Sequence, residues 1–461
     1  MKSFLLPTFF VLFVTLSFGQ NRTQFSKQEI LNDLQYLYTS LQDTHYNLYL
    51  YTTKTAFDQN YQSVKNSIQN DSLSLLETTN ALQRVIVAAN NGHTEIEFPA
   101  QSYRRYGDNG GTVFPLEIAF ENGSYFVRKN WSDEQKIEVG SKILSINGRS
   151  MEAILAKIYP QVSAERLYFK HAKIEVYSFP RYYWQVFGEE TEFTVEIASK
   201  NNRQTYTLNS INLIEDFEMK RKEVLNASMQ LSFYRRTAYL NPGDFGGDEP
   251  AYQQFIDDAF AQIQLENVSN LIIDLRNNGG GNDSFSDYLV SYIADKPFRW
   301  TSKYEVKSSA ILKKHIRASK NSNSEFSRAI LSHKNGDVFE YTFKEQQPQP
   351  KDKRFKGMVF VLVNRQSHSQ ATVTAAQIQD YKFGVIIGEE TGEYSSLCAS
   401  QLKYKLPNTN IEVKVSKGFM RRINGTVSKK GVQPDVVIQD HLVDEKDEIL
   451  TDVLGIIRQL N

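Results

Sequence analysis

The chain has 461 residues, of which 40% are hydrophobic and 12% aromatic. This is ordinary globular composition, and the length predicts two or three domains. Lysine and arginine together number 53, and aspartate and glutamate also number 53, so the formal net charge is zero. With no net positive charge and no stripe rich in lysine and arginine, the sequence argues against nucleic-acid binding.

The first twenty residues predict an export signal. Lys2 is followed by an apolar run over residues 4–18 and then by the small residue Gly19, which is the order of a secretory signal peptide. A transmembrane anchor is the alternative, but the run is shorter than the roughly 20 apolar residues that span a bilayer. We expect cleavage near Gly19 or Gln20, a secreted or periplasmic protein of the cell envelope, and no stable membrane anchor after signal removal.

The cysteine and histidine content predicts neither a cofactor nor a metal site. Cys398 is the only cysteine, which excludes an internal disulfide and a cysteine-based zinc site. The sequence contains no His-Glu-x-x-His motif or comparable ligand spacing, so a metal enzyme is not expected. The fold must therefore be held together by core packing.

Apolar spacing divides the chain into four parts. We expect the signal peptide over residues 1–20, a helical domain over 21–100, a β-rich domain over 101–210 and an α/β core over 211–461. Helical periodicity in "ILNDLQYLYTSLQ" defines the second part, which should end in a strand over residues 94–98. In the core, short apolar strands such as "NLIIDLR", "GMVFVLV" and "GVIIG" alternate with helical segments, which indicates an α/β fold. A loose polar insertion is expected at about 300–355.

A glycine loop in "LIIDLRNNGGGND" lies between a predicted buried strand and a helix. Gly279, Gly280 and Gly281 permit close backbone approach, and the helix start directs N–H groups into the loop. Such a loop suits a developing oxyanion. It matches neither the dinucleotide fingerprint nor the P-loop, and a plain tight turn is the alternative.

Two serines flank a histidine in "NRQSHSQATV", where a predicted strand turns into a helix. Ser369 is a candidate nucleophile, although hydroxyls at this place also serve as helix caps. His368 is a poor base for Ser369, because adjacent side chains on an extended turn point apart. His93, in the turn "NNGHTE" at a predicted domain junction, is the best candidate base; a surface histidine is the alternative.

Six motifs occur in one order: "GHT", "GSKILSING", "LIIDLRNNGGG", "VFVLVNRQSHSQA", "DYKFGVIIGEETG" and "GVQPD". Together they cover about 90–440, and the chain resembles the C-terminal processing (tail-specific) serine peptidase family in its tricorn-like branch. The resemblance implies a helical N-terminal part, a PDZ-like peptide-binding domain and an α/β core built as a β-β-α superhelix of the ClpP/crotonase-like type.

The resemblance also implies roles for particular residues. Ser369 would be the nucleophile, eleven residues before Asp380 of the Asp-Tyr pair, and His93 the general base. The backbone N–H of Gln370 and that of Gly279 or Gly280 would form the oxyanion hole. No cofactor or metal is implied.

The chain departs from the family pattern at several positions. Tyr394 stands where bacterial tail-specific members carry a lysine, so no Ser-Lys dyad is available there. Gly92 replaces a serine that precedes the histidine in the tricorn-like branch, and Ser428 stands where a glutamate is expected, which leaves the base without an orienting group. His368 and Gln370 replace the usual small residues beside the nucleophile.

These observations predict a secreted serine-type peptidase that cleaves peptides or protein C-terminal tails through an acyl-enzyme on Ser369. Its partners would be peptide or unfolded protein substrates. The alternative is a catalytically inactive descendant that binds peptides through its PDZ-like domain.

Overall fold

The computed structural model describes residues 22–199, 202–221 and 228–460. The predicted signal peptide, residues 1–20, therefore lies outside the described residues. Within the described ranges, no helix is both long and apolar enough to cross a membrane.

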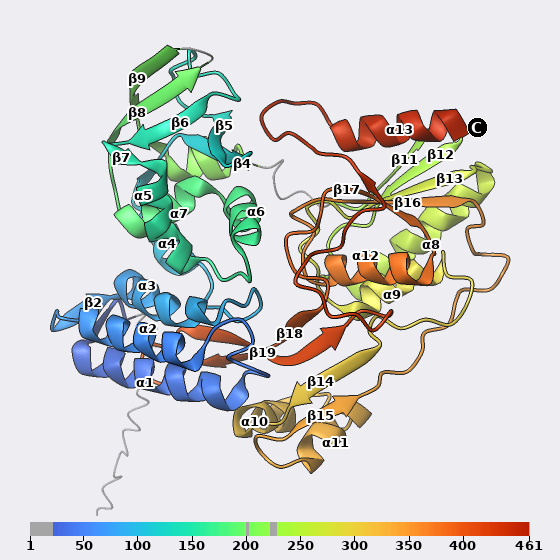
Figure 1. Ribbon diagram of the computed structural model, residues 1–461, viewed down its shortest axis with the longest axis horizontal. Helices are drawn as coiled ribbons and strands as arrows, with labels where there is room; N and C mark the ends of the chain where they lie inside the picture. Colours follow the sequence, from blue (N-terminus) through green and yellow to red (C-terminus); the bar gives the residue numbers. More distant parts are fainter. Residues whose placement is uncertain (1–21, 200–201, 222–227, 461) are drawn as a thin grey trace, which may run out of the picture.

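The N-terminal part consists of packed helices, as predicted (Figure 1). Ser26 and Ser74 open two of them with reciprocal capping boxes, which satisfy backbone N–H groups that a helix start leaves unpaired. The expected strand over residues 94–98 is wrong, because only Glu95 forms a bridge, to Lys414. The elements are β1 (Gln24–Ser26), α1 (Lys27–Thr44), α2 (Lys54–Ser67), β2 (Ser72–Ser74), α3 (Leu75–Ile86), a 3-10 helix (Val87–Ala89) and α4 (Ala100–Asp108).

These helices share their hydrophobic core with a hairpin from the far end of the chain. Leu34 and Leu37 of α1 are buried in one cluster with Val413 and Val415, which lie on β19 (Glu412–Arg421) beside β18 (Leu397–Lys405). The late hairpin lies against the N-terminal helices in Figure 1. The packing therefore brings the turn after the third helix next to residues about three hundred positions later.

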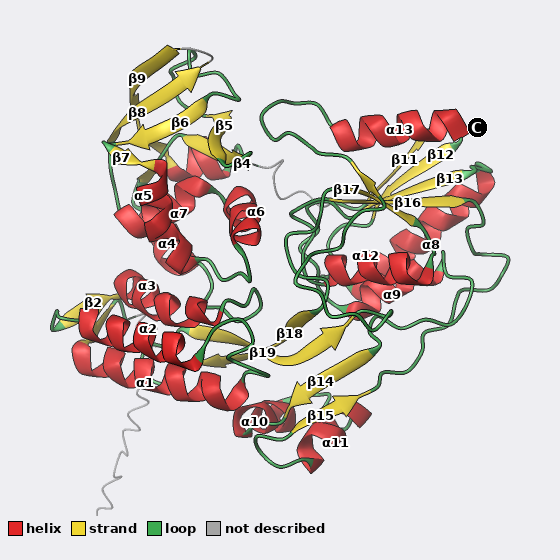
Figure 2. Ribbon diagram, in the orientation of Figure 1, coloured by secondary structure: helices red, strands yellow, loops and turns green. Residues whose placement is uncertain are grey.

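A separate antiparallel sheet with helices follows. Its strands run in the order β4-β5-β6-β8-β9, with β7 paired to β6, and the helices cover one face of the sheet (Figure 2). The buried residues of strands and helices form one cluster. The elements are β4 (Leu116–Glu121), β5 (Ser124–Asn130), β6 (Lys142–Ile146), β7 (Arg149–Ser150), α5 (Met151–Ile158), α6 (Leu167–Tyr177), α7 (Phe179–Phe187), β8 (Glu192–Ser199) and β9 (Asn202–Asn209).

The core is a six-stranded sheet in the order β11-β12-β13-β16-β17-β20, parallel except for the first pair. It confirms the expected α/β class. The C-terminal helix packs on one face of the sheet, and the other helices of the core pack on the opposite face (Figure 1). The elements are β11 (Gln230–Tyr234), β12 (Thr237–Asn241), α8 (Glu249–Leu265), β13 (Asn270–Asp274), α9 (Asp283–Ser291), β16 (Met358–Val363), α12 (Gln370–Tyr381), β17 (Val385–Gly388), β20 (Val436–Val437) and α13 (Glu448–Leu460).

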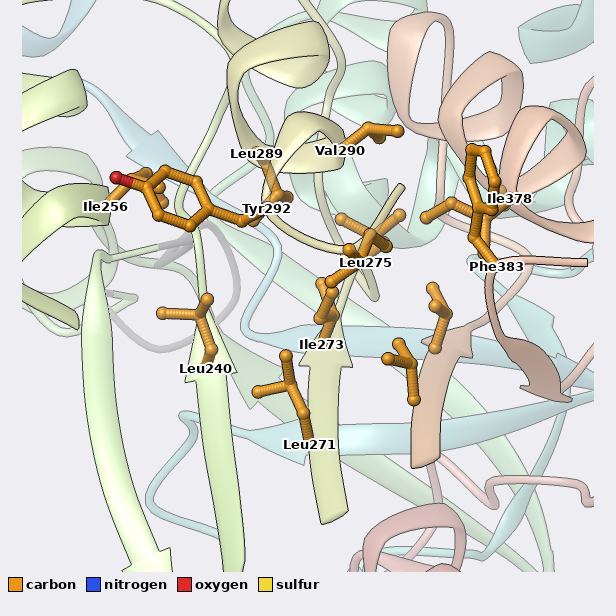
Figure 3. Packing of buried hydrophobic residues seen from close by; sticks show 14 of the residues in the cluster. Leu240, Ile256, Leu271, Ile273, Leu275, Leu289, Val290, Tyr292, Ile378 and Phe383 are labelled. Atoms are coloured by element: carbon orange, nitrogen blue, oxygen red, sulfur yellow. The ribbon is translucent and has the colours of Figure 1, made fainter. Parts of the chain in front are cut away.

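The central strand β13 shows why its sequence is a continuous apolar run. Leu271 and Ile273 pack against the helices α8, α9 and α12 (Figure 3), whereas Ile272 faces Ile449 of α13. A parallel strand buried on both faces needs apolar side chains at successive positions. The buried strand ends at the glycine loop, so the core fixes where that loop begins.

The insertion at 300–355 is not loose, and that expectation was wrong. Tyr304 and Val306 of β14 are buried with Leu312, Ile316 and Ile330 of two short helices. The strands join β18 and β19 in a sheet ordered β15-β14-β19-β18. Each short element buries only two or three apolar residues. The many polar residues around them therefore left no clear apolar spacing in the sequence. The elements are β14 (Lys303–Lys307), α10 (Ala310–Ala318), α11 (Glu325–Ser332) and β15 (Val338–Tyr341).

Candidate active site

The turn between β16 and α12 separates the roles of its two serines. Ser367 is fully buried; its hydroxyl donates to the carbonyl of Leu275 at 2.8 Å and accepts the N–H of Asn364 at 3.1 Å. Ser369 immediately precedes the helix, yet its side chain makes no capping hydrogen bond. Ser367 therefore holds the turn together, and the hydroxyl of Ser369 is left for other contacts.

Ser369 has an unusual backbone conformation, with φ 54° and ψ −122°. For a residue with a Cβ, a backbone conformation at such positive φ raises the free energy of the fold by on the order of 1–3 kcal/mol, and it persists only where the surroundings hold it. Support comes from both sides: the N–H of Ser369 donates to Glu393 Oε2 at 2.7 Å, and the N–H of His368 donates to the carbonyl of Asn278 at 3.0 Å. The strained turn presents the hydroxyl at the start of α12.

His93 lies beside this hydroxyl. Its Nε2 atom is 2.9 Å from Ser369 Oγ, although the two residues are 276 positions apart. The backbone N–H of His93 donates to the side chain of Asn91 at 3.2 Å, and Asn91 in turn accepts the hydroxyl of Ser416 on β19 at 2.8 Å. The turn is thus fastened to the late hairpin. The structure brings the predicted base and nucleophile into hydrogen-bond distance.

Glu393 lies on the other side of the imidazole, and sequence reasoning missed it. Its Oε1 atom is 2.7 Å from His93 Nδ1, and its side chain is fully buried. The two atoms are close but not aligned as a hydrogen bond among the described residues, and the contact becomes an ion pair when His93 is protonated. Glu393 is in the loop between β17 and β18, next to Tyr394, whereas Ser428 accepts an N–H within its own loop, that of Lys430.

The electrostatics of this pair favour a protonated imidazole. Burial alone would raise the pKa of Glu393, but the charges of His93 and His368, with the N–H of Ser369, outweigh it and hold that pKa at about 2. Burial also lowers the pKa of His93, and the charge of Glu393 more than offsets this, so the pKa of His93 is raised above its ordinary value. A buried carboxylate therefore stabilises the charge that His93 gains on taking a proton.

A second carboxyl group supports the turn before His93. Glu165 Oε1 accepts the N–H of Gly92 at 2.7 Å, while its Oε2 is buried without a hydrogen bond from the described residues. A Cβ at Gly92 would lie 2.7 Å from the ring of Phe169 and 3.2 Å from Glu165 Oε2, so a serine does not fit there without rearrangement. Burial, followed by the charge of Glu393, raises the pKa of Glu165 to about 7.

The glycine loop touches the serine turn. Gly280 has φ +83°, and a Cβ on it would lie 2.6 Å from the backbone nitrogen of Gln370 and from Ser369 Cβ. The N–H of Gly280 donates to Asn278 Oδ1 at 2.7 Å, and that of Gly279 donates to Asp244 Oδ1 at 2.9 Å. Both glycine N–H groups therefore already have acceptors in the protein.

The N–H of Gln370, unlike those of the two glycines, is not hydrogen-bonded within the described residues. It lies in the first turn of α12, where the helix dipole favours negative charge. The three predicted oxyanion donors thus line one cavity, and among them only the N–H of Gln370 lacks an acceptor among the described residues.

A cavity of about 720 Å³ opens onto these groups. An aromatic wall from the inserted elements lines one part of it, and the open edge of β18 contributes Ala399, Gln401 and Lys403. The aromatic wall consists of Trp300, Tyr304, Phe326 and Phe343, which are in ring-to-ring contact. An unpaired strand edge beside a cavity can bind an extended peptide by backbone hydrogen bonds.

Two further residues singled out in the sequence lie close by. His368 Nε2 is 3.7 Å from Glu393 Oε2, and the ring centroid of His368 is 5.2 Å from that of His93. Burial lowers the pKa of His368 to about 4. Tyr394 packs edge-on against Tyr51, and burial raises the pKa of its phenol. Tyr394 is therefore a poor proton acceptor near neutral pH.

Comparison with known proteins finds a family match for part of the chain and solved structures of similar fold. Residues 236–438 match peptidase family S41. The tail-specific protease of Haemophilus influenzae is 26% identical over 193 residues, which are 40% of this chain and 23% of that protein. This chain therefore matches less than a quarter of the length of that curated relative.

Solved structures share the fold over most of the chain. Mature CPAF in complex with lactacystin has a TM-score of 0.66 at 15% identity and covers 94% of this chain and 98% of its own. Mature CPAF alone has a TM-score of 0.63 at 15% identity, with 94% and 97% covered. Residues 236–438 therefore carry a peptidase family S41 domain, and the fold of most of the chain is similar to that of mature CPAF.

Proposed function

We propose that this protein is a serine-type peptidase that hydrolyses peptide bonds in peptides or in protein C-terminal tails. The observation that carries the proposal is the chain of contacts from Ser369 Oγ to His93 Nε2 at 2.9 Å and from His93 Nδ1 to the buried Glu393 at 2.7 Å. A hydroxyl, an imidazole and a carboxylate in this order form a nucleophile, a general base and an orienting group.

The first chemical step is acylation. Ser369 Oγ attacks the carbonyl carbon of the substrate while its proton passes to His93 Nε2, and Glu393 stabilises the resulting imidazolium. The negative charge on the carbonyl oxygen is met by the N–H of Gln370 and by that of Gly279 or Gly280. When the intermediate collapses, the C–N bond breaks and the imidazolium protonates the leaving amine. The acyl group remains as an ester on Ser369.

Deacylation reverses these roles. Water attacks the ester carbonyl and gives a proton to His93, the same N–H groups bind the oxyanion, and the C–O bond to Ser369 breaks as the proton returns to its hydroxyl. This cycle requires His93 to begin with a bare Nε2 and a proton on Nδ1. The carboxylate of Glu393 beside Nδ1 favours that tautomer.

One part of the oxyanion hole must rearrange. The N–H of Gly279 is bound to Asp244 Oδ1 at 2.9 Å, a carboxylate whose pKa is raised by burial. A substrate oxyanion must displace this carboxylate before Gly279 can donate to it. The N–H of Gln370 needs no such displacement, so we assign the larger share of oxyanion binding to Gln370.

The cavity suggests how substrates lie. An extended peptide can add to the free edge of β18, which ends one sheet beside the cavity. The aromatic wall then favours an apolar side chain near the scissile bond. We further propose that residues 101–210 form a PDZ-like domain that binds substrate ends, that residues 21–100 and 211–461 complete the site, and that residues 1–20 direct export to the periplasm or beyond.

A non-catalytic peptide-binding protein is the second candidate. It is favoured by one observation, that both Gly279 and Gly280 already donate to acceptors within the protein. Fluorophosphonate labelling discriminates between the two functions, since such probes react with activated serines. We expect labelling of the purified chain that is lost in Ser369→Ala; absence of labelling in the parent protein would favour peptide binding alone.

A further inference from the structure

We propose that His93, His368 and Glu393 form an inhibitory site for a divalent transition metal, with Zn²⁺ the ion that fits best. Metal binding is independent of the proposed peptidase activity, whereas the inhibitory consequence rests on it. Such a site would let free zinc hold the enzyme in a reversible inactive state.

The three side chains are already gathered. Each offers one ligand atom, and these atoms all lie within 4.8 Å of one another. Zinc binds nitrogen and oxygen at about 2.0–2.2 Å in a tetrahedral site, which puts neighbouring ligand atoms roughly 3.4 Å apart. His368 Nε2 and Glu393 Oε2, at 3.7 Å, are close to this spacing, and the remaining ligand atom must close in from a distance of at most 4.8 Å.

Two of the imidazole ligand atoms, His368 Nε2 and His93 Nδ1, lack a well-aligned hydrogen bond from the described residues, whereas Glu393 Oε2 accepts the N–H of Ser369 at 2.7 Å. His368 Nε2 is buried and has no hydrogen bond from the described residues. The contact between His93 Nδ1 and Glu393 Oε1 is short at 2.7 Å but lacks hydrogen-bond alignment. An unpaired imidazole nitrogen aimed at a buried carboxylate is an arrangement that a cation stabilises.

A bound metal would stop the reaction whichever nitrogen of His93 it takes. At Nε2, the metal uses the lone pair that must accept the proton of Ser369. At Nδ1, it replaces the contact with Glu393 that stabilises the imidazolium. In neither case can His93 pass a proton from the nucleophile to the leaving group.

His368 supplies the third ligand of this site, which the proposed catalytic groups alone do not provide. The sequence motif predicts a small residue there, and with a small residue only two ligands would remain. Two imidazoles and one carboxylate suit Zn²⁺ and its transition-metal neighbours, whereas Mg²⁺ and Ca²⁺ prefer sites made of oxygen. Mg²⁺ can therefore serve as the control ion, because it should not bind a site of this composition.

The test uses the full chain freed of metal with a chelator. Co²⁺ serves as the probe because its visible absorption bands report a low-coordinate site with nitrogen ligands, and Zn²⁺ is then added as a colourless competitor. The variants are His368→Ala, its conservative partner His368→Gln, and Ser369→Ala, which removes the nucleophile but no ligand. The exposed His315 on α10 supplies the matched control His315→Ala. Circular dichroism checks that each variant is folded.

We expect Co²⁺ bands in the parent, in Ser369→Ala and in His315→Ala, and their loss in both His368 variants. Zn²⁺ should also slow fluorophosphonate labelling of the parent, with at least a tenfold higher half-inhibitory concentration in the His368 variants and no effect of Mg²⁺. Absent Co²⁺ bands, or bands and zinc sensitivity unchanged without His368, would overturn the proposal. If the parent is never labelled, the peptidase proposal fails, while the Co²⁺ spectra still decide whether the metal site exists.

Discussion

Glu393 binds Ser369 as well as His93. One carboxylate oxygen accepts the backbone N–H of Ser369 at 2.7 Å, and the other lies 2.7 Å from His93 Nδ1. A single buried side chain thus orients the base and also supports the strained φ of the nucleophile. The predicted base and nucleophile lie 276 positions apart in the chain, and Glu393 contacts both of them.

Replacing Glu393 by glutamine should therefore lower the rate of serine labelling by at least tenfold, as loss of a triad carboxylate does in other serine peptidases. It should also move the pH profile. The charge of Glu393 raises the pKa of His93 while burial lowers it, so without that charge the pKa falls. Because only neutral His93 is a base, the rising limb of kcat/KM against pH should shift to lower pH. A limb that stays in place, or moves up, would contradict this account.

The glycine loop supplies a matched pair of substitutions. Gly280→Ala should reduce labelling of Ser369 by more than tenfold, because its Cβ would lie 2.6 Å from Ser369 Cβ and the backbone there has φ +83°. Gly279→Ala is the control, since its Cβ would meet only Asp244 Oδ1 at 3.7 Å. Equal labelling rates in the two variants would show that the close approach of the loop does not matter for the site.

The two serines of the turn should separate stability from activity. Ser367→Ala removes two hydrogen bonds from a fully buried position and should cost about 1–3 kcal/mol of unfolding free energy. Ser369→Ala should leave stability nearly unchanged and abolish labelling. Denaturant unfolding and labelling of the two variants test this. Reversed results, with Ser369→Ala destabilised and Ser367→Ala unlabelled, would mean that the nucleophile was assigned to the wrong serine.

Glu165 should make stability depend on pH. Its pKa of about 7 in the fold lies above the ordinary value of a glutamate, so the folded protein keeps a proton that the unfolded chain loses. The unfolding free energy contributed by this group therefore falls as pH rises from about 4.5 to 7. Glu165→Gln, which keeps an acceptor for Gly92, should raise the melting temperature at pH 8 relative to the parent by ~2 °C or more.

The comparison between pH 5 and pH 8 is the informative part of that experiment. The gain in melting temperature should be larger at pH 8, and Glu138→Gln at an exposed position should show no such trend. A gain that is equal at both pH values would assign Glu165 a packing role without a shifted proton equilibrium.

The sequence predicted those elements whose pattern lies within one short segment, and it failed where the pattern depends on packing against distant segments. The core strands and the helix after Ser369 follow from continuous apolar runs bounded by turn residues, and the structure has them as β13, β16, β17 and α12. The strand expected at 94–98 is a single bridge, because the alternation there reflects burial of Ile96 against the helices. Apolar spacing reports which side chains are buried but not what they are buried against.

The missing orienting group shows the same limit at the site. Glu393 lies in "GEETGEY", a loop with three glutamates, and nothing local distinguishes it from Glu389 and Glu390. Only the tertiary fold shows that Glu393 faces His93, whereas Glu390 binds Arg166 and Glu389 binds Arg365. Glu165 was invisible for the same reason, since its partner Gly92 belongs to a different part of the chain.

The site of a fluorophosphonate adduct and the rate at which it forms show whether His93 activates Ser369 as a nucleophile. The parent, His93→Ala and His368→Ala are labelled without added metal, digested and analysed by mass spectrometry. We expect the adduct on Ser369 in the parent, formation slowed by at least two orders of magnitude in His93→Ala, and a much smaller change in His368→Ala. An adduct on another residue, or equal rates in the parent and His93→Ala, would contradict this expectation.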